Sequence, residues 1–387
     1  MKTIEIKKNH HKRVLSGHLW IFSNELVSIP KYSPGELVEV FYENQSLGFG
    51  FYNPNSLISC RLLKYSDTNI QSLIYERILN AKKLRELLIP NANSYRLIYG
   101  ESDLLPGLIV DKYEDYFVIQ ILSYGFEIRK EILIDTLLSI FKQTKGIISR
   151  GNSKLRELEG LANTDEILFG SIPDNIEIED NGIKITVNLI SGQKTGYFLD
   201  QRYNRHYLRA ISKDKTILDV YCNLGGFGLN AYKGGAKEVT FIDVSAQAIE
   251  NTKKNLLSNN FDNYYLCNED VFSFLPNLIS QGKKYDIIVL DPPAFAKNKK
   301  SIYTAEAAYA KLNRYGIKLL NKNGFLISSS CSHYIDERKF NEIISKEIAK
   351  SGRNARLVYK AGHSPDHPIL PSMPETEYLK YLVHFVE

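Results

Sequence analysis

A cysteine and an aspartate stand at the ends of two apolar segments in the C-terminal half of the chain. Cys331 lies in the run Ser328-Ser329-Ser330-Cys331-Ser332, directly after residues 324–327, and Asp291 opens the run Asp291-Pro292-Pro293-Ala294-Phe295, directly after residues 285–290. The serines that flank Cys331 favour a strand end over a packed interior. Two prolines fix the backbone and remove two N–H donors. The aspartate loop is therefore predicted to form a stiff, carbonyl-rich edge that can hold a flat base, with Phe295 available for stacking.

The thiol of Cys331 could attack such a base covalently. C5 of a pyrimidine is too weakly nucleophilic to take a methyl group unaided, whereas addition of a thiolate at C6 makes C5 carbanion-like. Asp291 could then donate or share a proton at N3 of a cytosine. The alternative is that Cys331 is a small buried hydrophobe, as free cysteines often are. That structural role is the prediction for Cys60, Cys222 and Cys267.

Acidic and Gly-rich positions after three successive predicted strands are typical of a nucleoside site. Residues 219–228 read Asp-Val-Tyr-Cys-Asn-Leu-Gly-Gly-Phe-Gly, and glycines let backbone N–H groups approach a ligand closely. Asp243 ends the next strand, where a carboxylate can accept both hydroxyls of a ribose, and Asp270 can accept from an adenine amino group. No phosphate-binding lysine follows the glycines, which favours S-adenosylmethionine over ATP. The alternative for each acid alone is a helix cap.

The run 193–202 mixes polar groups, aromatic rings and glycine, which is not a core pattern. We expect it to fold over the methionine end of the cofactor; its alternative role is an entry loop to the following helix. The predicted cofactor contacts are Gln193, Tyr197, Asp200, Arg202, Asp219, Tyr221, Asn223, Gly225, Gly226, Phe227, Asp243, Val244, Asp270 and Asp291.

The elements that must position these residues are an α/β domain preceded by two smaller ones. Residues 1–70 contain short strands separated by Gly and Pro, which predicts a small β-barrel. Residues 71–185 combine helices and strands as an α+β domain. In residues 186–387, continuous apolar strands alternate with helices, which indicates a doubly wound parallel sheet. The strand-rich segments 356–359 and 378–386 predict an antiparallel finish to that sheet.

Composition sets further expectations. The chain has 387 residues, 43% of them apolar, and no apolar run approaches the roughly 20 residues needed to cross a bilayer. The N-terminus lacks the apolar core of a signal peptide, so we expect a cytoplasmic protein with no membrane partner. The four cysteines are scattered, so neither a disulfide framework nor a metal site is predicted. A homodimer is one assembly that the sequence permits.

Basic residues cluster where a polyanion could bind. The net charge is only +5, but residues 1–13 carry five Lys and Arg against one Glu, and a second basic cluster follows the Asp-Pro-Pro loop. Basic side chains beside a candidate active site suit a nucleic-acid substrate, although isolated surface lysines are common. The predicted RNA contacts are Lys12, Arg13, Trp20, Phe295 and Lys297.

The chain resembles the bacterial, S-adenosylmethionine-dependent ribosomal RNA cytosine-C5 methyltransferases that carry an N-terminal PUA domain. The resemblance runs nearly end to end. Its motifs are Lys12-Arg13-Val14, His18-Leu19-Trp20-Ile21-Phe22-Ser23, Asp103-Leu104-Leu105-Pro106-Gly107-Leu108-Ile109-Val110-Asp111, Thr195-Gly196-Tyr197-Phe198-Leu199-Asp200-Gln201-Arg202, Gly225-Gly226-Phe227, Asp291-Pro292-Pro293, Ser330-Cys331-Ser332 and Asp366-His367-Pro368. One departure is Asn223-Leu224 ahead of the glycines, where relatives usually have a threonine.

The resemblance implies a PUA barrel, a central α+β domain and a C-terminal Rossmann-like class I methyltransferase domain. It also implies a large-subunit rRNA cytosine as substrate and Cys331 as nucleophile; Asp291, at the proton of N3, is the second predicted catalytic residue. Two other hypotheses stay open. Relatives of similar architecture methylate guanine at N7 or N2, for which the thiol is dispensable. A non-catalytic RNA-binding assembly factor would need a damaged cofactor site, yet its acids and glycines are in place.

Overall fold

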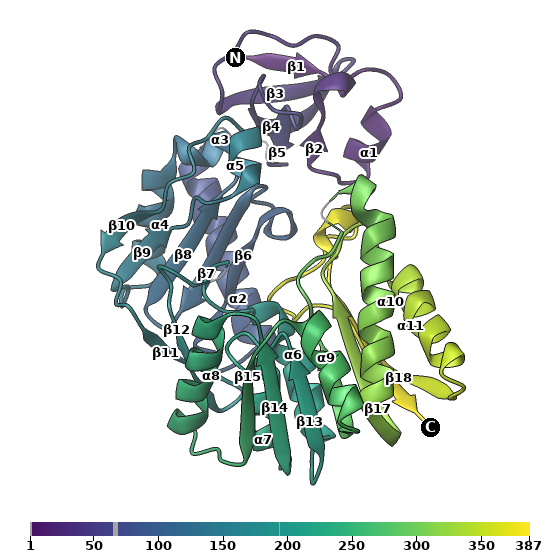
Figure 1. Cartoon of the computed structure of the whole chain (residues 1–387). Coiled ribbons are helices and arrows are strands. Elements are labelled where there is room, and N and C mark those ends of the chain that lie inside the picture. The colour runs from purple at the N-terminus through teal and green to yellow at the C-terminus, as the bar shows by residue number, and fades with distance from the viewer. Residues whose placement is uncertain (1, 65–68, 193, 297) are drawn as a thin grey trace. The chain divides into compact units, whose positions relative to one another are not determined.

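The computed structural model describes residues 2–64, 69–192, 194–296 and 298–387 (Figure 1). The chain forms two compact units. The first contains residues 1–178, 187–199 and 365–376, and the second contains residues 179–186, 200–364 and 377–387. Each unit therefore contains segments that are distant in the sequence, whereas the predicted domains were three consecutive ranges.

The N-terminal part of the first unit is a five-stranded sheet with the strand order β1-β3-β4-β5-β2. Val38, Val40, Leu19 and Ile21 are fully buried between its strands, which explains the alternation of apolar and polar residues. The predicted strand-rich domain is confirmed. Its elements are β1 (Thr3–Glu5), α1 (His11–Leu15), β2 (Trp20–Ile21), η1 (Ser23–Glu25), β3 (Glu36–Tyr42), β4 (Gln45–Tyr52) and β5 (Cys60–Leu62).

The rest of the first unit is a second five-stranded sheet with the order β10-β9-β8-β7-β6. The long helix α2 buries Ile74 and Ile78, and α4 buries Leu137, in one cluster with the strands. The strand β10 was not predicted. The elements are α2 (Ile70–Leu88), β6 (Ser94–Tyr99), η2 (Gly100–Asp103), β7 (Leu108–Tyr113), β8 (Tyr116–Ile121), α3 (Tyr124–Glu127), α4 (Lys130–Ile140), β9 (Gly146–Ser149), α5 (Lys154–Leu158), β10 (Glu166–Gly170) and η5 (Pro374–Thr376).

The second unit is built on a seven-stranded sheet with the order β15-β14-β13-β16-β17-β19-β18. Its elements are η3 (Leu199–Gln201), α6 (Arg202–Ala210), β13 (Thr216–Val220), α7 (Gly226–Lys233), β14 (Glu238–Asp243), α8 (Ala246–Ser258), β15 (Tyr264–Asn268), α9 (Val271–Ser280), β16 (Tyr285–Leu290), η4 (Lys299–Ser301), α10 (Ile302–Leu319), β17 (Leu320–Ser330), α11 (Glu337–Lys350), β18 (Ala355–Ala361) and β19 (Lys380–Val386).

Helices cover both faces of this sheet, as its continuous apolar strands require. The helices α9, α10 and α11 share one buried cluster with Leu218, Ile242 and Ile288. Phe241 points to the opposite face, where its ring meets α7 so closely that a Cβ on Gly228 would lie 2.1 Å from it. The four contacts among β13 to β17 are parallel, whereas β19 is antiparallel to both β17 and β18. The predicted doubly wound sheet and its antiparallel finish are confirmed.

A hairpin of β11 (Ile176–Asp180) and β12 (Ile183–Val187) spans the division between the units. Within the second unit it is held by α8, because Lys184 N donates to Asn259 Oδ1 at 3.0 Å and Thr186 N donates to Asn255 Oδ1 at 2.8 Å. Asp180 is fully buried there and pairs with Arg205 Nε at 2.7 Å. The hairpin therefore anchors the start of the second unit.

Candidate active site

The residues predicted to carry chemistry meet at one edge of the large sheet. The strands β13, β14, β15, β16 and β17 run in the same direction, so their carboxyl ends lie together. Val220 pairs with Leu290, and Leu290 pairs with Ser328. The loops that begin at Tyr221 and Asp291 and the segment that holds Cys331 therefore leave neighbouring strands.

The loop after β13 has an unusual backbone. Tyr221, Asn223 and Gly225 have φ angles of 65°, 52° and 80°. Tyr221 and Asn223 therefore have a backbone conformation that residues with a side chain rarely adopt. Such conformations are concentrated at ligand sites. Gly225 is required for space as well, because a Cβ there would lie 2.8 Å from Thr252 Cγ2. The loop thus turns sharply into the N-terminus of α7.

Asp219 is completely buried beneath this loop. Its Oδ2 accepts a hydrogen bond from Gly228 N at 2.9 Å. Its Oδ1 is buried and has no hydrogen-bond partner among the described residues. Burial raises the pKa of Asp219 to about 7, with Asp291 and Asp243 adding to the shift. An unsatisfied buried acceptor at the cofactor edge is a polar group that a bound ligand can satisfy.

Asp243 ends β14 and holds two loops together. Its Oδ2 accepts from Asn223 N at 3.0 Å, and its Oδ1 accepts from Ser245 N at 2.9 Å. The cap of α8 is Ser245, which accepts from Ala248 N. Asp243 is therefore not the cap of α8, and each carboxylate oxygen retains a lone pair that can accept a ribose hydroxyl.

Asp270 does cap a helix. Its Oδ1 accepts from Ser273 N at 3.0 Å at the start of α9, and its side chain is exposed. Val244 is 64% exposed beside Asp243. An N-cap aspartate uses one oxygen for the helix, so the capping alternative is correct for Asp270 and leaves its other oxygen for an amino group.

Asp291 is half-buried at the end of β16, and its Oδ1 accepts from Gln201 Nε2 at 3.1 Å. Asn204 Nδ2 donates in turn to Gln201 Oε1 at 2.6 Å. Gln201 and Asn204 are both buried. This amide chain fixes the orientation of the Asp291 carboxylate. Gln201 was not predicted as a site residue, although it lies within the polar run 193–202.

Cys331 is half-buried just beyond the end of β17. The serines beside it were predicted to mark a strand end and not a packed interior. The strand end is confirmed, because β17 ends at Ser330, but Ser328, Ser329, Ser330 and Ser332 are all buried. The hydroxyls of Ser328, Ser330 and Ser332 are tolerated because they bond inward, that of Ser328 to Asn313 Oδ1, whereas Ser329 Oγ has no hydrogen-bond partner among the described residues. Ser330 Oγ donates to Tyr309 OH at 2.9 Å, and Tyr309 OH lies 2.9 Å from Ser332 Oγ. This hydroxyl chain fixes the backbone on both sides of the thiol.

Lys380, the first residue of β19, is buried close to Cys331. Its Nζ donates to Ser332 O at 2.7 Å and to Tyr378 O at 2.8 Å. Burial lowers the pKa of Lys380 to about 8, while the charge of Cys331 acts in the opposite direction. Lys380 was not predicted as a site residue. The available signal was a lysine at the start of a largely apolar strand.

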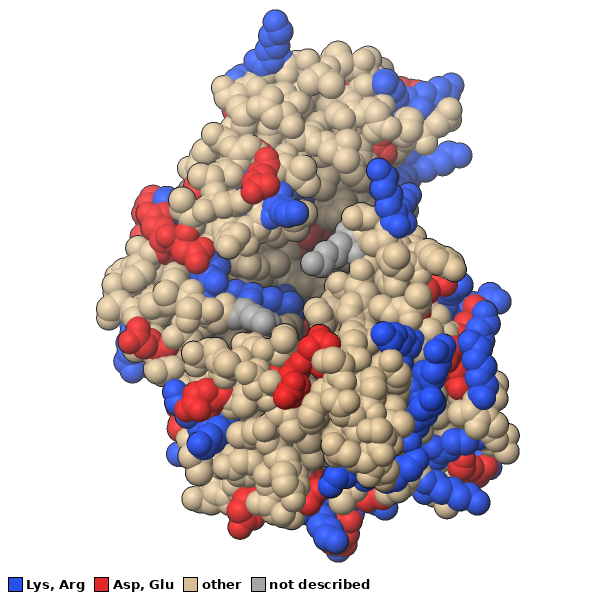
Figure 2. Space-filling view, viewed as in Figure 1, with Lys and Arg blue, Asp and Glu red and all other residues tan. Residues whose placement is uncertain are grey.

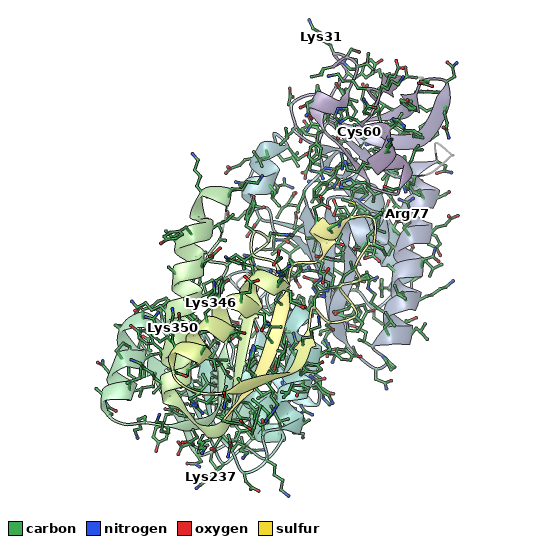
Figure 3. All side chains as sticks on the ribbon, turned by 90° about the vertical axis from the view of Figure 1, so that its right-hand side faces the viewer. Lys31, Cys60, Arg77, Lys237, Lys346 and Lys350 are labelled. Carbon is green, nitrogen blue, oxygen red and sulfur yellow. The ribbon has the colours of Figure 1, made fainter. Side chains whose placement is uncertain are left out.

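The other cysteines are poor nucleophiles. Cys60, labelled in the barrel in Figure 3, and Cys222 are buried, and Cys267 is half-buried. Burial raises the pKa of each of these three thiols. A thiol with a raised pKa has little thiolate at neutral pH. The predicted structural role of the three is in keeping with these surroundings.

Comparisons with known proteins agree with this arrangement. Residues 4–65 match a PUA-like domain, and residues 159–378 match the S-adenosylmethionine-dependent methyltransferase family. The chain belongs to this methyltransferase family. It is 38% identical over 391 residues to "Ribosomal RNA large subunit methyltransferase I" of Tolumonas auensis, covering 98% of each chain, and 36% identical to the protein of that name from Aliivibrio fischeri, again covering 98% of each.

Solved structures share the fold of the whole chain. A structure described as a sam-dependent methyltransferase from Streptococcus mutans has a TM-score of 0.85 at 21% identity, with 100% of both chains covered. A methyltransferase complexed with SAH, SMU.776, has a TM-score of 0.86 at 23% identity with the same coverage. A tRNA m1G37 methyltransferase from M. jannaschii has a TM-score of 0.51 over 80% of this chain at 19% identity. The fold therefore accommodates more than one methylation reaction.

The cofactor of this methyltransferase is S-adenosylmethionine, and the sheet edge is suited to it. The sheet edge provides hydrogen-bond acceptors in Asp219 Oδ1, which is unsatisfied among the described residues, and in the Asp243 carboxylate. The strained loop 221–225 provides N–H donors. None of these groups is a cation. A cofactor with hydroxyls, an amino group and no phosphate needs those groups. Gly226 and Phe227 are buried in the first turn of α7, and their cofactor contacts stay predictions.

The predicted contacts in the run 193–202 divide between the units. Gln193, together with the predicted RNA contact Lys297, lies outside the described residues. Tyr197 is buried in the first unit, where its N donates to Tyr113 OH at 3.1 Å and its O lies 3.3 Å from the same hydroxyl. In the second unit, Asp200 accepts from Tyr378 OH, and Arg202 lies 3.6 Å from Asp180. The cofactor roles of these residues stay predictions.

The predicted RNA contacts differ in their surroundings. Lys12 is exposed, whereas Arg13 makes two hydrogen bonds to Glu25, of 2.8 and 2.7 Å, that stabilise the barrel. Trp20 is half-buried, and Phe295 packs 4.8 Å from the Tyr309 ring as part of the core of the second unit. Figure 2 shows Lys and Arg side chains gathered on one face over α10 and α11. The structure thus gives Arg13 and Phe295 structural contacts in addition to any role in RNA binding.

Within residues 2–64, 69–192, 194–296 and 298–387, no helix is both long and apolar enough to cross a membrane. The same residues contain no group of three or more His, Cys, Asp or Glu side chains that could hold a metal ion.

Proposed function

We propose that this protein methylates C5 of a cytosine in large-subunit ribosomal RNA through a covalent bond between Cys331 and C6. The observation that carries the proposal is the position of Cys331 and Asp291 after the neighbouring parallel strands β17 and β16, on the same sheet edge as the cofactor loop. The RNA class is taken from the names of the relatives, which match this chain over nearly its whole length.

The reaction begins at the thiol. The Cys331 thiolate adds its electron pair to C6 of the cytosine, while Asp291 holds a proton at N3, so the displaced electron pair makes C5 nucleophilic. Bound S-adenosylmethionine supplies an electrophilic methyl group. C5 then carries both the methyl group and its original hydrogen. Loss of that C5 proton and departure of Cys331 from C6 restore the aromatic ring and the free thiolate.

Two parts of the chain support the reactive state of Cys331. Lys380 brings a positive charge close to the thiol, and an adjacent cation favours a thiolate. The buried hydroxyl chain of Ser330, Tyr309 and Ser332 fixes the backbone on either side of the sulfur. Gln201 orients Asp291 through its hydrogen bond at 3.1 Å. Each of these residues acts through Cys331 or Asp291, so we assign them positioning roles.

The test uses large-subunit rRNA that lacks the modification, methyl-labelled S-adenosylmethionine and nucleoside mass spectrometry. Label in 5-methylcytidine supports the proposal. Label in a methylguanosine would instead support the guanine alternative and remove Cys331 from the mechanism. A second RNA in which 5-fluorocytidine replaces cytidine tests the covalent step, because the C5–F bond prevents release of the enzyme. We expect a protein–RNA adduct that survives denaturation with the wild type and is absent with Cys331→Ala.

A further inference from the structure

The net positive charge of the chain is concentrated in one segment of the second unit. Residues 299–322 contain six Lys and Arg against the single acid Glu306, a net charge of +5. The whole chain also carries +5, so the remainder of the chain is neutral overall. The segment consists of η4, α10 and the start of β17, and Lys and Arg side chains gather over α10 in Figure 2. Such an uneven distribution favours a polyanionic partner.

Three of these cations lie on one exposed face of α10. Lys311, Arg314 and Lys318 are spaced by three and four residues, which places them side by side on a helix. All three side chains belong to exposed residues. At a rise of 1.5 Å per residue, they extend over about 10 Å of the helix axis. We name these three residues the α10 ridge.

The contacts of the ridge leave its charged groups accessible. Lys311 Nζ lies 5.2 Å from the centroid of the Phe272 ring. Arg314 Nε donates to Glu347 Oε2 at 2.6 Å, and the Arg314 side chain is 48% exposed. The N–H groups on its two Nη atoms can therefore bind a second acceptor. The Lys318 side chain makes no hydrogen bond or ion pair with the residues that the structure describes.

The ridge does not stabilise the helix that carries it. Like charges three and four residues apart destabilise a helix. The neighbouring α11 has the ordinary mixed pattern, in which Arg338 lies 3.4 Å from Glu342 and Lys350 lies 2.6 Å from Glu347. The helix dipole favours a cation in the last turn of α10, which accounts for Lys318 alone. A ligand therefore explains the other two ridge cations better than the stability of the fold does.

The helix α10 also reaches the nucleophile segment. Tyr309 OH lies 2.9 Å from the Oγ of Ser332, the residue after Cys331. The first turn of α10 follows the Asp291 loop, and its Tyr303 side chain is 84% exposed. An exposed aromatic ring is a surface on which a base can stack. An RNA strand that follows α10 from the ridge toward its first turn therefore approaches the candidate active site.

We propose that the α10 ridge binds the ribose-phosphate backbone of the RNA substrate, and that Tyr303 stacks on a base between the ridge and the target nucleotide. Phosphate contacts of this kind fix the position of the RNA without reading its sequence. The predicted RNA contacts lie in the barrel and in the loop after Asp291, so the ridge is an additional site. Because the ligand is taken to be RNA, the inference rests on the proposed function.

The triple variant Lys311→Gln, Arg314→Gln, Lys318→Gln tests the ridge. The full-length protein is titrated with a fluorescein-labelled single-stranded RNA of mixed sequence at several KCl concentrations. Each phosphate contact contributes about 0.7 to the log–log slope of affinity against salt for a single strand. We therefore expect a slope smaller by about 2 and, at low salt, a Kd at least about tenfold higher than for the wild type. An unchanged slope and Kd would overturn the proposal.

A charge-matched control is available at the other end of the sheet. Lys237→Gln, Lys253→Gln, Lys254→Gln removes three exposed cations from α8 and the residue before β14. The helix α8 packs on β14 and β15, whereas α10 packs on β16 and β17. We expect the wild-type slope and Kd. An equal loss in both triple variants would refute a specific site. A ridge variant that binds RNA normally but no longer binds polyglutamate would point to an acidic protein and also refute the proposal.

The stacking role of Tyr303 has its own test with the same RNA. Tyr303→Ala should raise the Kd about tenfold, whereas Tyr303→Phe keeps the ring and should bind like the wild type. Tyr265→Ala is the control, because Tyr265 is 56% exposed on β15, and we expect no change. Equal affinities of the wild type and Tyr303→Ala would show that the ring does not stack on the RNA.

Methylation of unmodified rRNA distinguishes failure of this inference from failure of the proposed function. The ridge is assigned no contact with the reacting atoms, so the ridge variant should raise KM for rRNA at least about tenfold and leave kcat unchanged. A wild-type KM with label in 5-methylcytidine would refute the ridge while the methylation proposal stands. A raised KM with label in a methylguanosine would support the ridge while the cytosine assignment fails.

Discussion

The sheet edge of the second unit and the cavity of the first unit that Trp20, Arg61 and Glu375 line are built differently. At the sheet edge, each functional residue lies at the end of its own parallel strand, so backbone hydrogen bonds place it. In the cavity, the three residues come from segments more distant in the sequence and are placed by side-chain packing. Strand ends tolerate substitution of a functional side chain, whereas a packed pocket loses its structure when a buried partner is removed.

Cys331→Ala should have the largest effect on catalysis. Removal of the nucleophile leaves no route to activate C5, so we expect methyl transfer to fall at least about a thousandfold. Binding of S-adenosylmethionine, followed by calorimetry, should stay near the wild-type value because the acidic loop is untouched. Unchanged transfer of label to cytidine by this variant would show that the thiol is not used.

Glu159→Ala should have the largest effect on stability. Glu159 is 3% exposed and accepts from Arg61 Nη2 at 2.8 Å, Ser56 Oγ at 2.6 Å and Asn53 Nδ2 at 3.1 Å. Removing one partner of a buried ion pair costs about 3–5 kcal/mol. Denaturant unfolding followed by Trp20 emission should show this loss.

A matched control for Glu159 is available on the same short helix. Glu157→Ala removes an exposed carboxylate from α5 and should change the unfolding free energy by less than about 0.5 kcal/mol. If the two variants are equally stable, the claim that the walls of the cavity depend on their buried partners is wrong.

Asp243→Ala should weaken cofactor binding without unfolding the protein. Its carboxylate faces the cofactor edge and accepts from Asn223 N at 3.0 Å. Loss of hydrogen bonds to a charged group costs about 1.5–3 kcal/mol, so the Kd for S-adenosylmethionine should rise roughly 10- to 100-fold. Calorimetric titration measures this directly. The control is Glu269→Ala, an exposed acid after the adjacent strand, for which we expect the wild-type Kd.

Lys380→Met tests the smallest expected effect, which depends on pH. The pKa of Lys380 is lowered to about 8, so its positive charge is present below that pH and is lost above it. Thiolate stabilisation by Lys380 should follow the same course. We expect the pH midpoint for alkylation of Cys331 by iodoacetamide to rise by about 1 unit or more in the variant, with equal rates well above pH 8.

The alkylation measurement needs a background in which the other thiols are replaced by alanine or serine. Lys346→Met, an exposed lysine on α11 that Figure 3 labels, is the control and should leave the midpoint unchanged. A midpoint that is the same in wild type and Lys380→Met would reduce Lys380 to a purely structural donor to Ser332 O and Tyr378 O.

Much of the sheet edge could be predicted because a parallel sheet imposes its own geometry. Alternating apolar strands and helices required the Gly-rich loop after β13, the acid that ends β14 and the cysteine after β17 to share one edge. Cys331 does follow the end of β17, but the expectation that its serines mark an unpacked environment was wrong, since they are buried and Ser330 and Ser332 bond to Tyr309. Polarity alone does not report exposure, because a buried hydroxyl is stable once its hydrogen bonds are satisfied.

The sequence by itself determined which residues can do chemistry and along which strands they lie, because strand periodicity and loop composition are local properties. Tertiary structure decided the rest. Three features join residues that are far apart in the chain: Lys380 close to Cys331, the hydrogen bond from Gln201 to Asp291, and the cavity lined by Trp20, Arg61 and Glu375. Such contacts depend on how packed side chains fill space, and no local pattern encodes which distant residue will complete a buried hydrogen bond.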